Sequence, residues 1–235
     1  MTAQAAAPVL LVLLPLLGSI LVFLLPRGRA LCGVAIAGGN LVLLVAAIDH
    51  LMTVGAWQHA VGGWGAPLGI DLYLDGLSAV MLTMTGLVAL GISVYSTAYF
   101  TAGAARHFWP LWLLLLAAMN ALFLSRDLFN LYVTLELVGI AAVSLTAMRG
   151  QRTALVAAMR YLLATLLGSM AYLLGVALLY HSAGSVDIVL VGEAQVPGSV
   201  AAVAFATMVT GLLLKTALFP FHFWLPAAHA SASAP

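Results

Sequence analysis

The chain alternates long apolar runs with short polar connections, and this pattern predicts helices that cross a membrane. A helix needs about 20 predominantly apolar residues to span the hydrocarbon core of a bilayer. Seven runs approach that length, and the last continues past a break at Pro220 to Trp224. The predicted spans are Pro8–Leu25, Ala30–Ile48, Leu77–Phe100, Phe108–Leu124, Leu128–Met148, Thr153–Leu179 and Ser199–Leu218. We therefore predict an all-α, polytopic transmembrane helix bundle of about seven spans, forming a single transmembrane domain over residues 1–235.

Composition indicates the same class of protein. Hydrophobic residues make up 64% of the 235 positions and charged residues 6%, whereas an average soluble domain has about 25% charged residues. The formal net charge of +1 gives no basic surface for a nucleic acid. The single cysteine, Cys32, allows no intrachain disulfide and no cysteine-rich metal site. Because the sequence also has no nucleotide-binding loop and no nucleophile motif, we expect no cofactor, no metal and no catalytic chemistry in this chain.

Arginines in the connections predict the orientation, because cytoplasmic connections of membrane proteins carry an excess of Lys and Arg. The connections after the first, third and fifth predicted helices hold Arg27, Arg29, Arg106, Arg149 and Arg152. Those after the second, fourth and sixth helices hold only Arg126. We therefore expect the odd-numbered connections in the cytoplasm and the N-terminus outside.

Three charged residues fall inside predicted spans, namely Glu136, Arg160 and Lys215. A charge at the bilayer centre costs about 2.5–3.5 kcal/mol on insertion scales, so such residues commonly have a function. Arg160 lies nearer one end of its helix and can reach the interface. Glu136 and Lys215 should face the bundle interior, close enough to couple. They form either a structural ion pair or a proton-transfer pair. Proton transfer is possible because desolvation favours the neutral forms of both groups, whereas their pairing favours the charged forms.

A proline and two histidines follow Lys215 at regular spacing. Pro220 cannot donate a backbone hydrogen bond, so the helix should break there. Freed carbonyl groups at membrane depth are tolerated where protein or a water-filled cavity satisfies them. On a continuous helix, His222 would return to the face of Lys215 with a rise of about 10.5 Å, and His229 repeats that spacing. The pattern favours a hydrated half-channel, while a structural or interfacial role for the histidines stays open.

Two other groups of polar residues have simpler interpretations. Small and polar residues follow a helical spacing at Tyr161, Thr165, Gly168, Tyr172 and Gly175. Such a seam usually lets two helices approach closely. Asp71 and Asp75 precede the third span, and we expect them to cap that helix or to face water.

Three segments resemble one family of membrane proteins. The run Leu131–Leu137, which contains Glu136, resembles the glutamate-bearing fifth helix of antiporter-like proton-translocating subunits. The run Lys215–Ala230 resembles the broken seventh helix of the same family, and Asp75–Ser78 is similar to the entry into its third helix. This family occurs in the membrane arm of respiratory complex I, in Mrp-type sodium/proton antiporters and in membrane-bound hydrogenases. The resemblance covers essentially the whole chain.

The resemblance implies a proton-translocation path through five residues. Glu136 matches the pumping glutamate of the family, and Lys215 matches its partner lysine. His222 and His229 match histidines found in several branches of the family. Arg160 stands where a lysine is more usual, and an arginine does not readily release a proton.

The resemblance further implies a subunit of a multisubunit complex in the inner (plasma) membrane of a prokaryote. Its function would be proton, or cation/proton, translocation, with redox chemistry in partner subunits of an NADH:quinone oxidoreductase or a hydrogenase. The chain corresponds to the N-terminal half of the family and ends at Pro235, within the broken helix. A fragment, a split subunit and a natural truncation all fit, so expected partners are lipid, other membrane subunits and the C-terminal half as a separate chain. The alternative function is a non-conducting membrane scaffold or assembly subunit.

Overall fold

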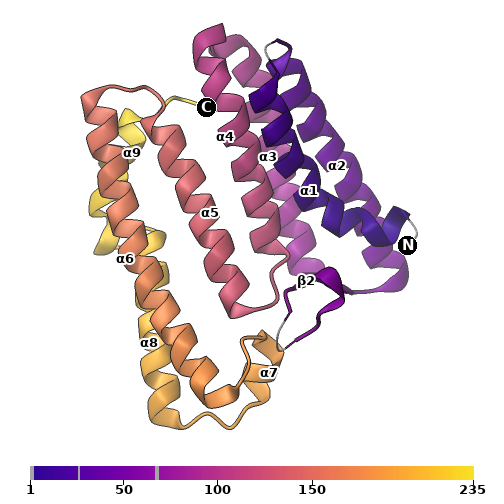
Figure 1. The fold of residues 1–235 in the computed structure, drawn as a ribbon, viewed down its shortest axis with the longest axis vertical. Coiled ribbons are helices and arrows are strands. Elements are labelled where there is room, and N and C mark those ends of the chain that lie inside the picture. The colour runs from indigo at the N-terminus through magenta and orange to yellow at the C-terminus, as the bar shows by residue number, and fades with distance from the viewer. Residues whose placement is uncertain (1–2, 26, 67–68) are drawn as a thin grey trace. The chain divides into compact units, whose positions relative to one another are not determined.

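The computed structural model describes residues 3–25, 27–66 and 69–235, and most of them are helical (Figure 1). The long helices are α1 (Ala3–Leu24), α2 (Arg29–Val54), α3 (Gly76–Tyr99), α4 (Ala102–Phe123), α5 (Leu128–Ala147), α6 (Arg152–Ala183) and α8 (Gly198–Lys215). The short elements are β1 (Trp57–Ala60), η1 (Val61–Gly63), β2 (Asp71–Leu74), α7 (Ile188–Glu193), η2 (Phe221–Trp224) and α9 (Leu225–Ser231). Each predicted span coincides with one long helix to within a few residues at most ends, and the predicted helical class is confirmed.

Six of the described helices are long and apolar enough to cross a membrane, judged by length and composition. These six are α1, α2, α3, α5, α6 and α8. The remaining predicted span, Phe108–Leu124, lies in α4, which also contains Arg106, His107 and Asn120 and is therefore more polar. Many α4 side chains are buried, so protein rather than lipid covers much of this helix. The polytopic transmembrane fold is confirmed.

Aspartate caps set the start of two of the long helices. The Asp75 carboxylate accepts a hydrogen bond from the Ser78 N–H at the start of α3, at 2.8 Å. The Asp127 carboxylate accepts one from the Asn130 N–H at the start of α5, at 2.6 Å. The capping role expected for Asp75 is thus confirmed. The expectation for Asp71 was wrong, because this residue lies in β2 with 4% of its surface exposed and neither caps α3 nor faces water.

Residue contacts divide the chain into two compact units, each described here by itself. The first unit contains α1 to α4, and the second contains α5 to α9 together with η1. In the first unit, α1 packs on α2 and α4, and α2 also packs on α3. In the second, α6 packs on both α5 and α8 (Figure 1). The single transmembrane domain expected for residues 1–235 stays a prediction.

A proline inside α1 is accommodated by two buried asparagines of the first unit. Pro15 has no N–H, so the Leu11 carbonyl loses its usual helical donor. The side-chain amides of Asn40 and Asn120 donate to this carbonyl at 3.0 and 2.7 Å. Asn120 also donates to the Asn40 side-chain oxygen at 3.2 Å. These polar groups satisfy one another away from water and tie α1 to α2 and α4, so we assign them a structural role.

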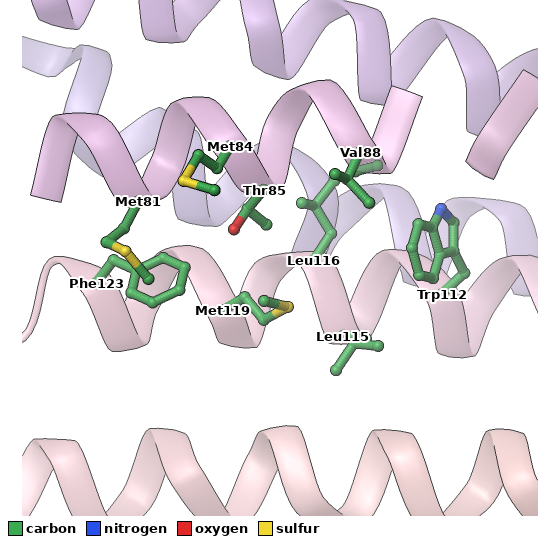
Figure 2. Close-up of a pocket in the computed structure, with 10 residues that line it drawn as sticks. Met81, Met84, Thr85, Val88, Trp112, Leu115, Leu116, Met119 and Phe123 are labelled. Atoms are coloured by element: carbon green, nitrogen blue, oxygen red, sulfur yellow. The ribbon is translucent and has the colours of Figure 1, made fainter. Parts of the chain in front are cut away.

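An apolar pocket of about 320 Å³ lies between α3 and α4 of the first unit (Figure 2). The pocket is lined by Met81, Met84 and Met119, together with the rings of Trp112 and Phe123. The Trp112 Nε1 donates to the Ser93 hydroxyl at 2.9 Å, so the polar atom of that ring already has a partner. None of the lining residues is ionisable, and the pocket therefore contributes no group for acid–base chemistry.

Glycines bring α6 and α8 of the second unit into close contact. A Cβ atom on Gly175 would lie 2.5 Å from the Ala204 carbonyl oxygen, and one on Gly211 would lie 2.3 Å from the Gly168 carbonyl oxygen. Neither contact leaves room for a side chain. The seam predicted along α6 therefore packs against α8 at its glycines, as expected from its spacing.

The last predicted span is broken, as expected, although its helix ends earlier than Pro220. Regular helix stops at Lys215, and Ala217 has a left-handed backbone with φ of 53°. The chain then continues through η2 and α9. The Trp224 Nε1 donates to the Leu214 carbonyl at 3.0 Å, which satisfies one of the carbonyl groups left free at the helix end.

Candidate functional site

Glu136 and Lys215 form an ion pair inside the second unit. The Lys215 Nζ lies 2.7 Å from Oε1 of Glu136. The Lys215 side chain is 8% exposed and the Glu136 side chain is 23% exposed, so both charges lie largely away from solvent. The proximity expected from the sequence is present in the structure.

Two helices position this pair. Glu136 lies near the middle of α5, and Lys215 is the last residue of α8. The C-terminus of a helix carries partial negative charge, which stabilises a cation placed there. The Lys215 Nζ also lies 3.5 Å from the carbonyl oxygen of Leu135. The ammonium is therefore held by a carboxylate, a backbone carbonyl and the end of its own helix.

Ser169 on α6 contacts the same carboxylate oxygen as Lys215. Its hydroxyl lies within hydrogen-bonding contact of Oε1 of Glu136 and 3.0 Å from the Thr165 carbonyl. Ser169 is fully buried. Because the hydroxyl has one proton, it donates to only one of these oxygens at a time. It can donate to a Glu136 carboxylate, or accept from a protonated Glu136 while donating to Thr165.

The sequence prediction did not include Ser169. This residue follows Thr165 by four positions and precedes Tyr172 by three, so it has the spacing of the seam predicted on this helix. The periodicity could therefore have included it. Its contact with Glu136 depends on how α5 and α6 pack, which the sequence pattern alone does not define.

Gly168 makes room for the Lys215 side chain. A Cβ atom on Gly168 would lie 3.4 Å from Lys215 Cγ and 2.7 Å from the Gly211 carbonyl oxygen. The second distance is too short for a real contact, so any larger residue would push α8 away from α6. The close approach of these helices is thus part of the geometry that places Lys215 beside Glu136.

Arg160 lies apart from the ion pair. It is exposed and lines a pocket of about 350 Å³ with Arg152 of the same helix and with Ser231 of α9. Within residues 3–25, 27–66 and 69–235, the Arg160 guanidinium makes no ion pair. The structure therefore brings Arg160 to an arginine-lined pocket and not to Glu136.

His222 and His229 are also exposed and make no ion pair with any other described side chain. The ring of His222 stacks on Phe219, with 5.6 Å between the ring centroids. The histidines do not continue the helix that contains Lys215, because α8 ends at Lys215 and Ala217 has a left-handed backbone conformation. The helical spacing predicted between Lys215 and the histidines is therefore absent. Their roles in a path stay predictions.

A second group of charged residues lies where three connections of the second unit meet. Asp127 and Asp187 form an isolated antiparallel bridge, and the Arg126 N–H donates to the Asp71 carbonyl at 3.3 Å. The Arg126 Nε lies 3.4 Å from Oδ2 of Asp187. The three aspartates are 4–5% exposed. This cluster was not predicted, because its members lie in separate connections of the sequence.

One protein family matches the part of the chain that contains the ion pair. The family described as NADH:quinone oxidoreductase/Mrp antiporter, TM, matches residues 125–235. That range contains Glu136, Lys215 and Ser169, and most of the second unit.

Two curated relatives match nearly the whole chain. NADH-quinone oxidoreductase subunit N of Desulforudis audaxviator (strain MP104C) is 35% identical, over 98% of this chain and 48% of the relative. A probable K(+)/H(+) antiporter subunit of Rhizobium meliloti (strain 1021) is also 35% identical, over 97% of this chain and 44% of the relative. The chain thus spans about half the length of the curated relatives it matches.

A solved structure shares the fold. A chain of the membrane-bound sulfane sulfur reductase, an archaeal respiratory membrane complex, superposes with a TM-score of 0.89 at 27% identity. The match covers 96% of this chain and 48% of that chain. Together with the matched family and the two relatives, it shows that this chain belongs to the NADH:quinone oxidoreductase/Mrp antiporter transmembrane family.

Proposed function

We propose that this chain takes part in proton, or cation/proton, translocation within a membrane subunit of a multisubunit complex. The observation that carries the proposal is the largely buried ion pair between Glu136 and Lys215. The relatives support it, since they are named as a quinone oxidoreductase subunit and an antiporter subunit. The chain spans about half the length of these relatives, so we propose the activity for the assembled complex and not for this chain alone.

The pair can pass a proton without leaving an isolated charge in the membrane. Two opposite charges in contact offset part of each other's desolvation cost. When the Lys215 ammonium gives its proton to the Glu136 carboxylate, both groups become neutral, as a low-dielectric environment favours. The neutral lysine then takes a proton from one side, and the carboxylic acid of Glu136 releases one to the other. Each cycle carries a proton through the pair and restores both charges.

Arg160, His222 and His229 are proposed as further members of the path. Their resemblance to family positions supports this assignment, and their exposure lets them exchange with water or with parts of the complex outside the described residues. A guanidinium keeps its proton under all conditions the protein meets. Arg160 therefore contributes a fixed positive charge, while the two histidines can bind and release protons.

The proposed setting is the inner (plasma) membrane of a prokaryote, with the N-terminus outside. The excess of arginine in alternate connections supports this orientation. Partners are other membrane subunits and lipid, with electron-transfer chemistry located in different chains if the complex is a redox enzyme. Purifying the native complex and identifying its subunits distinguishes the two types: cluster-binding and quinone-site subunits indicate a redox complex, and small antiporter subunits indicate an Mrp type.

The proposal is tested by Glu136→Gln in the assembled complex. Glutamine keeps the shape of the side chain but cannot take up the proton of Lys215. We expect proton or sodium flux in sealed vesicles, normalised to the amount of assembled complex, to fall to background. Glu193→Gln is the matched control, because Glu193 is an exposed residue at the end of α7. Normal flux per complex in Glu136→Gln would support the non-conducting scaffold instead.

A further inference from the structure

The charged cluster at the start of α5 contains more negative than positive charge in a buried place. Asp71, Asp127 and Asp187 are 4–5% exposed, and Arg126 is the cation that lies among them. Among the described residues, no group of His, Cys, Asp or Glu has an arrangement that could hold a metal ion. Binding a proton to one carboxylate reduces the buried negative charge.

Asp187 already has partners for both of its carboxylate oxygens. Its Oδ1 accepts from the N–H groups of Val189 and Leu190 at 2.9 and 3.0 Å, capping α7. Its Oδ2 faces the Arg126 Nε at 3.4 Å. One cation and two backbone donors therefore contact this carboxylate.

Asp127 differs from Asp187 in this respect. Its Oδ1 caps α5 through the Asn130 N–H, whereas its Oδ2 is buried and has no hydrogen-bond partner in the part of the chain that the structure describes. A buried carboxylate oxygen without a partner is costly. A proton on Oδ2 removes the charge and leaves the Oδ1 cap in place. Of these two carboxylates, Asp127 is thus the one better suited to hold a proton.

The electrostatic surroundings of Asp127 raise its pKa and so also favour a bound proton. Burial raises the pKa of Asp127 most, and the Asp187 and Asp71 carboxylates raise it further. Backbone N–H groups at the start of α5 act in the opposite direction but do not offset the burial. The charged and titratable groups that face Asp127 are Arg126 in its own connection, Asp71 in β2, Asp187 before α7 and Tyr172 in α6.

Two hydroxyl-bearing residues of α6 contact α5, one at its first residue and one at Glu136. The Tyr172 hydroxyl donates to the carbonyl of Leu128, the residue after Asp127, at 3.3 Å. Ser169 precedes Tyr172 by three residues, so the two lie on neighbouring turns of the same face of α6. Ser169 in turn contacts the Glu136 carboxylate. Both hydroxyl-bearing residues are buried, at 3% and 0% exposure.

We propose that Asp127 is a second proton-binding site of this chain, which exchanges protons with Glu136 along the hydroxyl groups between α5 and α6. A proton leaves Oδ2 of Asp127, and each hydroxyl or intervening water between Asp127 and Glu136 accepts one proton as it passes its own to the next group. The Glu136 carboxylate accepts the last proton and Asp127 becomes a carboxylate, so charge and protons balance. The reverse direction uses the same groups. This inference rests on the proposed function of Glu136.

The experiment compares flux in Asp127→Asn and Asp75→Asn. Asparagine caps a helix about as well as aspartate, so both variants should keep their helix starts and assemble. Asp75 is the matched control, because its carboxylate caps α3 through the Ser78 N–H in the first unit. We expect vesicle flux per assembled complex to fall in Asp127→Asn to the level of Glu136→Gln, while Asp75→Asn keeps the flux of the unaltered protein.

Measuring Glu136→Gln in parallel shows whether the Asp127 site alone is wrong or the proposed function is wrong as well. Normal flux in Asp127→Asn with no flux in Glu136→Gln overturns the Asp127 site and leaves the proposed function intact. Normal flux in both variants overturns the proposed function and the Asp127 site with it. If Asp127→Asn does not assemble, Tyr172→Phe tests whether protons pass between Asp127 and Glu136. This variant removes the hydroxyl and keeps the aromatic ring and the α5 cap. Reduced flux in Tyr172→Phe supports this exchange of protons, and normal flux overturns it.

Discussion

The indole ring of Trp224 lies flat on the ring of Tyr161, with 4.3 Å between the ring centroids and 4° between the planes. Trp224 belongs to η2 and Tyr161 to α6. The same indole donates through Nε1 to the Leu214 carbonyl, one residue before Lys215. One side chain therefore ties the segment after the break to α6 and also holds the end of α8.

Trp224→Phe should keep the aromatic stack and lose the hydrogen bond to Leu214. We expect a loss of about 1 kcal/mol of stability, the net worth of one hydrogen bond. Trp224→Ala should cost more, about 3–5 kcal/mol, because it also leaves a cavity. Apparent unfolding midpoints in detergent measure both effects. Trp64→Phe is the control, since Trp64 is 70% exposed, and an equal loss in that variant would contradict the assigned role of Trp224.

The sequence identified Glu136 and Lys215 because a charge stands out in an apolar run. Their contact could be predicted because a buried charge needs a partner and few others were present. The broken helix was predicted from Pro220, but its end at Lys215 was not. At that end, Ala217 has a left-handed backbone and the indole of Trp224 bonds to the Leu214 carbonyl. The indole contact forms only when the segment after the break packs on α8, which the sequence pattern does not define.

Ser169 and the Asp127 cluster could not be identified in the same way. A serine in a membrane helix is common and usually bonds to its own backbone, so only the packing of α5 on α6 reveals its contact with Glu136. The cluster joins three connections that are far apart in the sequence, and each aspartate alone has the pattern of a cap or turn. The strands β1 and β2 were missed because each is four residues long and lies in a glycine-rich connection.

Gly168→Ala should destabilise the second unit. The new Cβ would meet the Gly211 carbonyl at 2.7 Å, and overpacking of this kind costs about 1–3 kcal/mol. Gly139→Ala is the matched control, because it lies in α5 with no atom within 4 Å of the position of a Cβ. Alanine is favoured over glycine in a helix by about 1 kcal/mol, so the control should be neutral or stabilised. Equal unfolding midpoints for the two variants would contradict the close approach of α6 and α8.

Ser169→Ala should reduce flux without preventing assembly. The change removes a hydrogen-bond donor from the Glu136 carboxylate and keeps the volume of the side chain nearly constant. Ser169→Thr retains the hydroxyl and should preserve more of the flux than Ser169→Ala. Ser144→Ala is the control, because the Ser144 hydroxyl bonds only to the Ile140 carbonyl of its own helix among described residues. Flux in Ser169→Ala equal to that in Ser144→Ala would show that the hydroxyl has no part in translocation.

Asp127 should make the stability of the protein depend on pH. Its pKa is raised in the folded state, mainly by burial, above an unfolded value of about 3.9. The folded protein therefore binds this proton more tightly than the unfolded chain, and the resulting stabilisation is fully present below the unfolded pKa. It is lost as pH rises through the folded pKa.

Asp127→Asn should remove this part of the pH dependence, since asparagine does not titrate in that range. The measurement is the apparent unfolding midpoint as a function of pH, for the unaltered protein, Asp127→Asn and Asp75→Asn. We expect the unaltered protein and Asp75→Asn to lose stability relative to Asp127→Asn as pH rises. Parallel curves for all three proteins would mean that Asp127 has the same proton affinity folded and unfolded.

Lys215 distinguishes a proton carrier from a structural partner of Glu136. If Lys215 gives and receives protons, Lys215→Arg should abolish flux, because the guanidinium stays protonated under all conditions the protein meets. Lys215→Ala should abolish flux as well, and it leaves the Glu136 carboxylate without its cation. Removing one partner of a buried pair costs about 3–5 kcal/mol, so the amount of assembled complex should fall more in Lys215→Ala than in Lys215→Arg.

If Lys215 instead only holds the helices together, arginine should replace it with little loss, since it can pair with the same carboxylate. Flux must therefore be normalised to the amount of assembled complex, so that lost translocation is separated from lost protein. Arg152→Lys is a control for the exchange of the two cations, because Arg152 is exposed at the start of α6. Normal flux per complex in Lys215→Arg would exclude Lys215 as a carrier, while the Glu136–Lys215 contact would keep its structural role.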